Sequence, residues 1–423
     1  MNKKPLFTPV LSDLIEKKLQ GLSPIQTIMK LAEKQEIIKM GLHPDEIISF
    51  GGGWCNHRTP ELLMEVYREI IEDETLFHQS GRYSPIKGDY ECINQLASFE
   101  KTIYNITDIT PENILLGHSA TQLMHDTLRV VQNPGSSVCV FDPTYANYGN
   151  TVKCALPNSH LSYIPALDTA SWTYLPDPQQ SLDMLQDFCK NGAKSLIIPV
   201  PDNPTSQIPS DSFIKAARDI MEDHHGFLIL DFAYKALWFD DMPDCYSWSP
   251  NQFENLISIH SHSKWLSSLG RRFGWIEAHP NVIKGIEKIT ESTLLSPDTL
   301  HSMATTRFLK KSIKNQTLKS YINSTRMLYK KTAEILIENI EQYLGWNYLI
   351  PQGGLYTVCP IPNNENSVTF VERVLKNTGV LMIPGTGFGP SMNHAVRISY
   401  GPLCYDNNKI EEGIKKIGKY LSI

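Results

Sequence analysis

Short apolar runs alternate with amphipathic stretches along the middle of the chain, from about residue 110 to residue 280. The amphipathic stretches, of which 211–221 is an example, carry apolar residues at the spacing of a helix. Such an alternation is typical of an α/β domain in which a mostly parallel sheet is flanked by helices. The runs that we expect to form buried strands are 114–116, 138–141, 196–200, 227–230 and 256–259.

The C-terminal part of the chain shows a different order of elements. A long helical stretch over about residues 316–343 precedes shorter strands and helices in mixed order. We expect these strands at 355–358, 380–383 and 395–400, and the helices at 367–376 and 408–421. This order favours a smaller α+β domain, which the N-terminal segment completes. The predicted divisions are an N-terminal segment (1–75), a large domain (76–315) and a small C-terminal domain (316–423).

The composition is that of an ordinary globular protein. Of the 423 residues, 41% are hydrophobic and 20% are charged, and the net charge is −6. A negative net charge argues against a broad surface for nucleic acid or acidic membranes. No apolar run approaches the roughly 18 residues of a membrane span, and the N-terminus leads into mixed polar sequence instead of a signal region. We therefore expect a soluble, cytoplasmic protein without a nucleic-acid or membrane partner.

Eight cysteines are scattered along the chain. They form no Cys-x-x-Cys motif and no cysteine–histidine cluster at the spacing of zinc ligands. Several lie in apolar runs, as Cys139 does, where a reduced core cysteine is expected. The sequence therefore predicts no metal site.

Polar residues follow the predicted strands, and ligands of open α/β sheets bind beyond the carboxyl ends of such strands. After the first run, Ser119, Ala120 and Thr121 open a helical stretch. Small residues at a helix start leave free N–H groups and a positive dipole end, which can bind phosphate. A plain N-cap is the alternative interpretation.

The second and third runs are followed by residues that could contact an aromatic ligand. Tyr145 offers a flat face for stacking, although a tyrosine in a turn often serves packing alone. Asn203 lies in an Asn-Pro turn and could donate its amide to a ligand oxygen, or could serve only the turn.

Asp231 ends the fourth run, and Tyr234 follows three residues later. A carboxylate after four apolar residues is costly to bury unless a cation or several donors meet it. A protonated ring nitrogen is one such cation, and a helix cap is the competing explanation.

Lys264 follows the fifth run, in the segment Ser261-His262-Ser263-Lys264. Lysine is almost never buried without a partner, so a lysine at the end of a buried strand is unusual. A partly desolvated amine can attack a carbonyl and hold it as a Schiff base. Ser261 and Arg272 have the reach to bind phosphate, with charge-assisted hydrogen bonds of about 1.5–3 kcal/mol each.

Arg397 lies in the predicted strand 395–400, between Val396 and Ile398, and therefore points to the opposite face from both. A guanidinium in mid-strand is suited to bidentate binding of a carboxylate. A structural ion pair is the alternative.

Taken together, these residues supply a Schiff-base lysine, a phosphate cradle, a partner for a ring nitrogen, a stacking ring and a carboxylate clamp. That combination indicates pyridoxal 5'-phosphate as the cofactor. The chain resembles the fold-type I, class I/II aminotransferases over nearly its whole length. The segment Ser261-x-Ser263-Lys264 with Gly270 and Arg272 is similar to the lysine signature of that family.

The resemblance implies a role for each residue. Lys264 would form the Schiff base, Asp231 would pair with the pyridine nitrogen, and Arg397 would hold the substrate α-carboxylate. The resemblance also implies other contacts with the cofactor. Its phosphate would be bound by Ser119, Ala120, Thr121, Ser261 and Arg272. Its phenolic oxygen would accept hydrogen bonds from Asn203 and Tyr234, and its ring would stack on Tyr145.

Two further residues are implied by the resemblance alone. Gly53 is similar to an N-terminal glycine of the family that approaches the substrate through its backbone. Tyr83 resembles a tyrosine that reaches the phosphate of the neighbouring subunit, so a homodimer is implied, with the N-terminal segment contributing to its contact.

The chain also departs from the family pattern. Ser206 stands where a glycine is usual after Asn-Pro-Thr, and residues 54–57 read Trp-Cys-Asn-His in place of an acidic-proline pattern. No arginine lies near 290–297, which makes a dicarboxylate donor less favoured. Trp54 with Tyr148 hints at a bulkier or aromatic substrate side chain.

The function implied by the resemblance is transfer of an amino group between an L-amino acid and a 2-oxo acid through a Lys264 Schiff base. The alternatives on the same scaffold are a C–S or β-lyase, a decarboxylase and an oxidative deaminase. A sensor or regulator built on this fold is a further alternative, but no basic recognition helix is evident in the chain.

Overall fold

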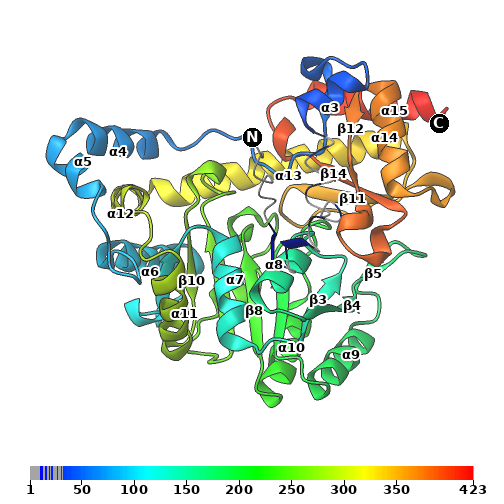
Figure 1. Cartoon of the computed structure of the whole chain (residues 1–423). Helices are drawn as coiled ribbons and strands as arrows, with labels where there is room; N and C mark the ends of the chain where they lie inside the picture. The colour runs from blue at the N-terminus through cyan, green and yellow to red at the C-terminus, as the bar shows by residue number, and fades with distance from the viewer. Residues whose placement is uncertain are drawn as a thin grey trace, which may run out of the picture.

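A seven-stranded sheet forms the centre of the large lobe, in the lower half of Figure 1. Its order is β2-β10-β9-β8-β7-β3-β4, and every strand is parallel to the others except β10, which is antiparallel to both neighbours. The structure, a computed structural model, describes residues 32–422 together with residues 10–12, 15, 16, 19, 21, 26 and 30. The strands are β2 (Ile114–Gly117), β3 (Ser137–Asp142), β4 (His160–Pro165), β7 (Ser195–Pro199), β8 (Phe227–Phe232), β9 (Leu256–Ser261) and β10 (Gly274–Glu277).

The mostly parallel α/β sheet is confirmed, and all five predicted runs are strands of it. Two strands of this sheet, β4 and β10, were not predicted. β4 is half-exposed and carries no continuous apolar run, and β10 contains only four residues, Gly-Trp-Ile-Glu. Neither has the pattern of a buried strand, so periodicity alone could not find them.

Helices cover both faces of this sheet because side chains of successive strand residues point to opposite faces. Leu115 packs with one group of helices, whereas Ile114 and Leu116 pack with the other. The first group is α7 (Ala120–Val131), α8 (Tyr148–Ala155) and α11 (Pro280–Thr293). The second is α6 (Tyr90–Tyr104), α9 (Pro178–Lys190), α10 (Asp211–Asp223) and α12 (Thr299–Lys314).

A smaller lobe lies above the sheet at the right of Figure 1. Its three-stranded antiparallel sheet has the order β11-β14-β13, and β1 forms a separate parallel pair with β12. These strands are β1 (Ile48–Ser49), β11 (Tyr356–Pro360), β12 (Val380–Leu381), β13 (Ile383–Pro384) and β14 (Ala395–Ser399). The helices of this lobe are α3 (Lys34–Lys39), α14 (Ser367–Thr378) and α15 (Asn407–Leu421).

The prediction of one strand at 380–383 is wrong, because two short strands lie there. The chain changes partner at the buried Met382, so β12 pairs with β1 and β13 pairs with β14. The apolar run is continuous through this break, because both halves are buried. Burial therefore hid the change of partner from the sequence pattern.

The long helix α13 (Thr317–Tyr343) belongs to both lobes. Its Leu318 and Ile322 pack in the core of the large lobe, and its Leu336 and Ile340 pack in the core of the small lobe. Near the N-terminus, α4 (Glu61–Glu72) and α5 (Glu74–Ser80) instead lie against α12. The domain divisions at residues 75 and 315 stay a prediction.

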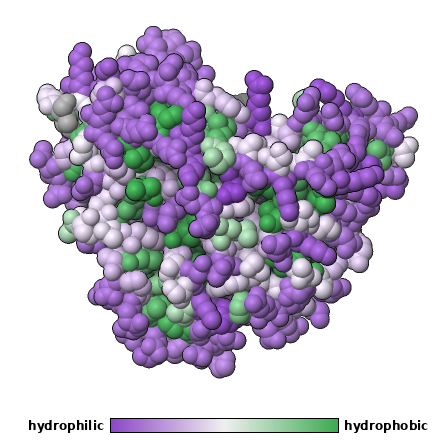
Figure 2. Space-filling model, turned by 180° about the vertical axis from the view of Figure 1, so that it is seen from behind, coloured by the Kyte–Doolittle hydropathy of each residue, from purple (hydrophilic) through white to green (hydrophobic). Residues whose placement is uncertain are grey.

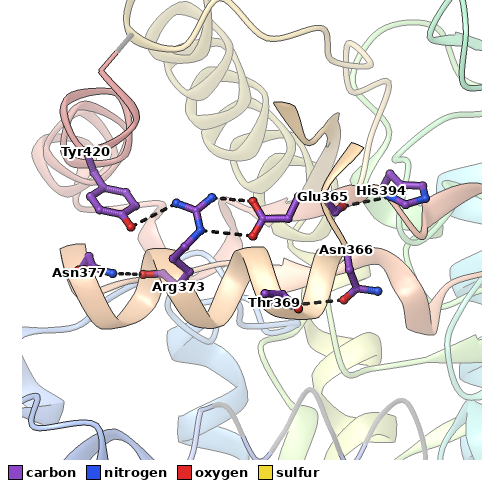
Figure 3. Close-up of polar contacts among 7 residues, drawn as sticks. All are labelled: Glu365, Asn366, Thr369, Arg373, Asn377, His394 and Tyr420. Carbon is purple, nitrogen blue, oxygen red and sulfur yellow. Dashed lines mark hydrogen bonds and ion pairs between the residues drawn. The ribbon is translucent and has the colours of Figure 1, made fainter. Parts of the chain in front are cut away.

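Polar contacts join the elements of the small lobe (Figure 3). Arg373 of α14 donates to both carboxylate oxygens of Glu365, at 2.6 and 3.3 Å, and to the hydroxyl of Tyr420 in α15 at 3.2 Å. Asn366 caps α14, since its side-chain oxygen accepts from the backbone N–H groups of Val368 and Thr369. The hydrogen bond between Arg373 and Tyr420 joins α14 to α15.

The face seen from behind is mostly hydrophilic, with apolar residues in small scattered groups (Figure 2). Within the part of the chain that the structure describes, no helix has the length and apolarity needed to cross a membrane. The large apolar clusters are instead buried, on the two faces of the seven-stranded sheet and inside the small lobe.

The contact between α15 and β1 gives a test of this packing. A Cβ at Gly413 would lie 2.6 Å from Cε2 of Phe50 and 2.9 Å from Cγ2 of Ile48, and both side chains are buried. We expect Gly413→Ala to lower the free energy of unfolding by about 1–3 kcal/mol, because these side chains cannot move aside. Urea denaturation measures this change.

The matched control is Gly149→Ala in α8, where the nearest atom to a new Cβ is 3.8 Å away. There the substitution should leave stability unchanged or raise it by up to about 1 kcal/mol, the gain in helix propensity. Equal effects of the two substitutions would contradict the packing argument.

Candidate active site

A cavity of about 650 Å³ lies beyond the carboxyl ends of β7, β8 and β9, where the two lobes meet. All of the predicted site residues line it except Tyr83. They are Gly53, Ser119, Ala120, Thr121, Tyr145, Asn203, Asp231, Tyr234, Ser261, Lys264, Arg272 and Arg397. Residues more than 300 positions apart in the chain therefore meet in one cavity.

Lys264 enters the cavity from the turn that follows β9. Its amino group donates a hydrogen bond to the backbone oxygen of Gly53 and lies 5.3 Å from the centre of the Tyr234 ring. The side chain is partly buried, and these contacts are with neutral groups. An amine in such a place is available for chemistry because, among the described residues, no carboxylate forms a salt bridge with it.

Asp231 lies near the end of β8 and is buried. The Tyr148 hydroxyl donates to its Oδ2 at 2.8 Å, and the N–H of Ala233 donates to its Oδ1 at 3.0 Å. Burial raises the pKa of this carboxyl, and the two hydrogen bonds oppose the rise only in part. The charge of Lys264 also acts on this carboxyl, but among the described residues Asp231 forms no direct ion pair, and a protonated ring nitrogen would supply one. A helix cap does not explain it, since no α-helix starts here.

Tyr148 was also considered for the substrate side chain. Its hydroxyl instead bonds Asp231, and its ring meets Tyr145 edge-on, with ring centres 5.4 Å apart. The contact with Asp231 places Tyr148 in support of that carboxylate. Trp54 also lines the cavity and is partly exposed. The prediction that it contacts the substrate side chain stays a prediction.

The start of α7 has the features of an anion site. Ser119 is the N-cap residue but makes no side-chain cap hydrogen bond, so the plain N-cap interpretation is wrong. Its φ is 102°, a strained conformation for a residue with a side chain. The serine hydroxyl and the first N–H groups of the helix remain available to phosphate oxygens.

Ser261 and Arg272 lie near this helix start along the cavity wall. The Ser261 hydroxyl donates to the hydroxyl of Ser263 at 2.9 Å and accepts from its N–H at 3.1 Å. Arg272 has left-handed backbone geometry and donates to the backbone oxygen of Leu269 at 2.6 Å. The arginine adds a full positive charge to the helix dipole, as a phosphate group would require.

Arg397 projects from β14 of the small lobe and is 5% exposed. It donates to Oδ1 of Asn203 at 3.0 Å and to the backbone oxygen of Gly51 at 3.1 Å. Its guanidinium carbon lies 4.3 Å from the centre of the Tyr356 ring, and its Nε is buried without a partner among the described residues. None of these contacts is with a carboxylate. Among the described residues, Arg397 therefore does not form the structural ion pair that was the alternative.

The contact with Arg397 also orients Asn203. A guanidinium can only donate, so the side-chain oxygen of Asn203 must face Arg397 and its NH₂ group is left as a donor. Tyr234 is buried and shares a 2.6 Å hydrogen bond with the hydroxyl of Tyr356, and burial holds its pKa well above the usual range. Burial likewise raises the pKa of Tyr145 to about 12, so both phenols are neutral donors at ordinary pH.

Tyr356 is a residue of the cavity that the sequence did not single out. Its hydroxyl bonds Tyr234, its ring lies against Arg397, and a Cβ at Gly53 would come within 3.3 Å of its oxygen. The strand that carries it was predicted, but its register against β14 was not, and register decides which of its residues faces the cavity. A glycine at 53 thus leaves room beside Tyr356 and Arg397.

Tyr83 lies outside the cavity and is 83% exposed. Its predicted role at the phosphate of a neighbouring subunit requires a second chain and stays a prediction. The remaining groups fit pyridoxal 5'-phosphate: a carboxylate that forms no direct ion pair among the described residues for the ring nitrogen, an anion site for the phosphate, neutral donors for the phenolic oxygen and an amine for the aldehyde.

Known proteins resemble this chain over most of its length. It is 24% identical over 407 residues to an aspartate aminotransferase of Pyrococcus horikoshii, covering 96% of this chain and 98% of the relative. It is 26% identical over 389 residues to an LL-diaminopimelate aminotransferase of Maridesulfovibrio salexigens, covering 91% and 94%. A substrate-bound structure of BacF from Bacillus subtilis shares the fold, with a TM-score of 0.82 and 22% identity, covering 98% of each chain.

The family model for class I and II aminotransferases matches residues 45–417, which include β1 and most of α15. The match contains every residue that lines the cavity except Ala32. The chain therefore belongs to the class I and II aminotransferases and is a pyridoxal-phosphate-dependent transaminase, as the order of its motifs predicted.

Proposed function

We propose that the cavity between the lobes is where this transaminase moves an amino group between an L-amino acid and a 2-oxo acid, with Lys264 as its reactive amine. The observation that carries the proposal is a pair of buried charged side chains in that cavity, neither of which forms a direct ion pair among the described residues. The Asp231 carboxylate and the Arg397 guanidinium each make hydrogen bonds to neutral groups among the described residues. A cationic ring nitrogen and a substrate carboxylate would complete them.

The cofactor contacts follow from the same geometry. The start of α7 with Ser261 and Arg272 would hold the phosphate, and Asp231 would keep the ring nitrogen protonated. The NH₂ of Asn203 and the hydroxyl of Tyr234 are suited to the phenolic oxygen. When bound, pyridoxal phosphate supplies an electron sink for the negative charge that develops at the substrate α-carbon.

The reaction itself needs one group that moves a proton. The amine of Lys264, once released by the incoming substrate amine, would take the proton from the α-carbon and return it one carbon away. Arg397 would hold the α-carboxylate meanwhile and so fix which bond of the α-carbon faces the lysine. The backbone oxygen of Gly53 is an acceptor that can hold the lysine proton near the substrate.

We also propose a homodimer. Large apolar side chains are exposed along the segment from α4 to the start of α6, which projects from one side of the molecule (Figure 1). They are Met64 (46%), Ile71 (56%), Phe77 (55%), Tyr83 (83%) and Tyr90 (66%). Burial of such a patch against a second copy would bring Tyr83 to the partner's site.

A cytoplasmic location stays a prediction. No disulfide joins any of the eight cysteines, all of which lie in the described part of the chain. This is compatible with a reducing compartment.

Replacement of Lys264 tests the central proposal. Lys264→Ala should remove the visible absorption of the bound cofactor and lower kcat by at least about 10²- to 10⁴-fold, the usual contribution of a positioned proton-transfer group. In the unmodified enzyme an amino donor alone should convert the cofactor to its amine form, and a 2-oxo acid should restore it. Absorption spectra of these half-reactions provide the measurement.

The control is Lys284→Ala, at an exposed position of α11, which should change neither property. Release of ammonia or carbon dioxide without conversion of the cofactor would exclude transamination. Full turnover by Lys264→Ala would exclude the proposed site.

Replacement of Arg397 tests the carboxylate site. Arg397→Lys should raise KM for the amino donor by about 10- to 100-fold, because a point charge loses the bidentate contact. The cofactor should stay bound and absorb in the visible range, with at most a small shift of its band, since Arg397 is assigned to the substrate and reaches the cofactor only through Asn203. Arg373→Lys is the matched control, because Arg373 holds Glu365 far along the small lobe. An unchanged KM in Arg397→Lys would assign the carboxylate to another residue.

The homodimer has a separate test. Light scattering should give about twice the chain mass of 47.9 kDa. Tyr83→Phe should weaken cofactor binding about tenfold through the loss of one hydrogen bond to phosphate, with the dimer intact. A monomer with full activity would contradict both statements.

A further inference from the structure

The loop that contributes Gly51, Gly53 and Trp54 to the cavity is held from behind by a buried histidine, His57. This side chain is 3% exposed and does not line the cavity. Its Nδ1 lies 2.8 Å from the hydroxyl of Tyr329. Its Nε2 lies 3.1 Å from the backbone oxygen of Trp265 and 3.0 Å from the hydroxyl of Tyr321.

These partners belong to two other parts of the site. Tyr321 and Tyr329 lie on α13, the helix that packs in both lobes. Trp265 directly follows Lys264. His57 therefore connects the cavity loop to the turn that carries the reactive lysine and to the helix behind both.

The hydrogen bonds allow one arrangement of protons. The Tyr321 hydroxyl donates to the Trp265 oxygen at 2.7 Å, so both atoms that face Nε2 can accept from it. Nε2 must therefore carry the ring proton, and Nδ1 is left as an acceptor.

Tyr329 completes this arrangement. Its hydroxyl oxygen accepts from the backbone N–H groups of Asn56 at 3.2 Å and of His57 at 3.3 Å. Its own proton can then be donated to Nδ1 of the His57 ring at 2.8 Å, and the thiol of Cys404 is a further side-chain partner of this hydroxyl. Burial lowers the pKa of His57 to about 4, so the ring is neutral at ordinary pH.

The other end of the loop contacts the catalytic groups directly. The oxygen of Gly51 accepts from Arg397 at 3.1 Å, and the oxygen of Gly53 accepts from Lys264. The hydroxyl of Ser399, two residues after Arg397, donates to the oxygen of Gly52 at 2.5 Å. The carbonyls of Gly51 and Gly53 thus face the two residues that would bind and transform the substrate, and Ser399 holds the carbonyl between them.

We propose that His57, as the Nε2–H tautomer bonded to Tyr329, Tyr321 and Trp265, is a positioning residue that holds the carbonyls of Gly51 and Gly53 against Arg397 and Lys264. It touches neither cofactor nor substrate and acts through the loop. The inference rests on the proposed roles of Lys264 and Arg397. Residues 54–57 of this loop read Trp-Cys-Asn-His, which differs from the acidic-proline pattern expected from the family resemblance. His57 therefore lies in the part of the loop that differs from that pattern.

The test compares three substitutions in the holoenzyme. His57→Leu removes both ring nitrogens, and Tyr329→Phe removes the hydroxyl that serves Nδ1 and two backbone N–H groups. Each should raise KM for the amino donor, lower kcat and reduce kcat/KM about tenfold or more, the value of one or two lost hydrogen bonds. His57→Gln keeps a donor and an acceptor and should stay within about threefold of the unmodified enzyme.

Two further measurements separate positioning from general stability. The pH at which the visible band of the bound cofactor titrates should fall in His57→Leu and Tyr329→Phe by on the order of one unit, because the Gly53 carbonyl no longer stabilises a positively charged Lys264 nitrogen. Nitrogen-15 NMR of labelled histidine, assigned with His57→Gln, should show a neutral Nε2–H ring. Tyr343→Phe is the matched control, because Tyr343 lies on the same helix with its hydroxyl exposed against Glu411.

An Nδ1–H ring or an imidazolium at pH 7 would overturn the proposal. Equal losses in His57→Leu and His57→Gln with an unchanged titration of the band would also overturn it. If His57→Leu does not fold, Tyr329→Phe and the NMR measurement decide the question. Failure of the proposed function is distinguishable, because it would appear as turnover in Lys264→Ala and would leave the tautomer of His57 unaffected.

Discussion

Burial of charge without counter-charge is the constraint on which the rest of this site depends. Removing an isolated ionised group from water costs several kilocalories per mole or shifts its protonation. Asp231 is 8% exposed and Arg397 is 5% exposed, and both make hydrogen bonds to neutral groups among the described residues. Folding therefore leaves a carboxylate and a guanidinium in the cavity, neither of which forms a direct ion pair among the described residues. A ligand with the opposite arrangement of charges recovers part of this cost when it binds.

The two charges come from different lobes, which makes the arrangement of the lobes part of the chemistry. Asp231 ends a parallel strand of the seven-stranded sheet, whereas Arg397 lies in the three-stranded sheet. The helix α13 packs in both cores and therefore limits how far one lobe can move relative to the other. The loop at 51–57 lies between them, bonded to Arg397 at one end and to the segment after Lys264 at the other.

The sequence predicted five of the central strands and the polar residues that follow them, because both have strong local signals. Five apolar runs with polar residues after them are enough to place Lys264 and Asp231 at one edge of a parallel sheet. The sequence could not show the change of partner at Met382 or the inward position of Tyr356, since each depends on which strand lies alongside. The partners of His57 were hidden for the same reason, because they lie more than 200 residues away.

The pairing of β1 with β12 has a consequence for the order in which the chain assembles. Ile48 leaves the ribosome early, but its strand partner, Val380, is made more than 300 residues later. The adjoining loop likewise waits for Tyr321, Tyr329 and Arg397. The strands of the seven-stranded sheet end by Glu277 and the last helices that cover its faces, α11 and α12, end by Lys314, whereas the substrate side of the cavity forms only when the C-terminal segment arrives. A nascent or truncated chain would thus have a folded sheet long before it has a place for the substrate.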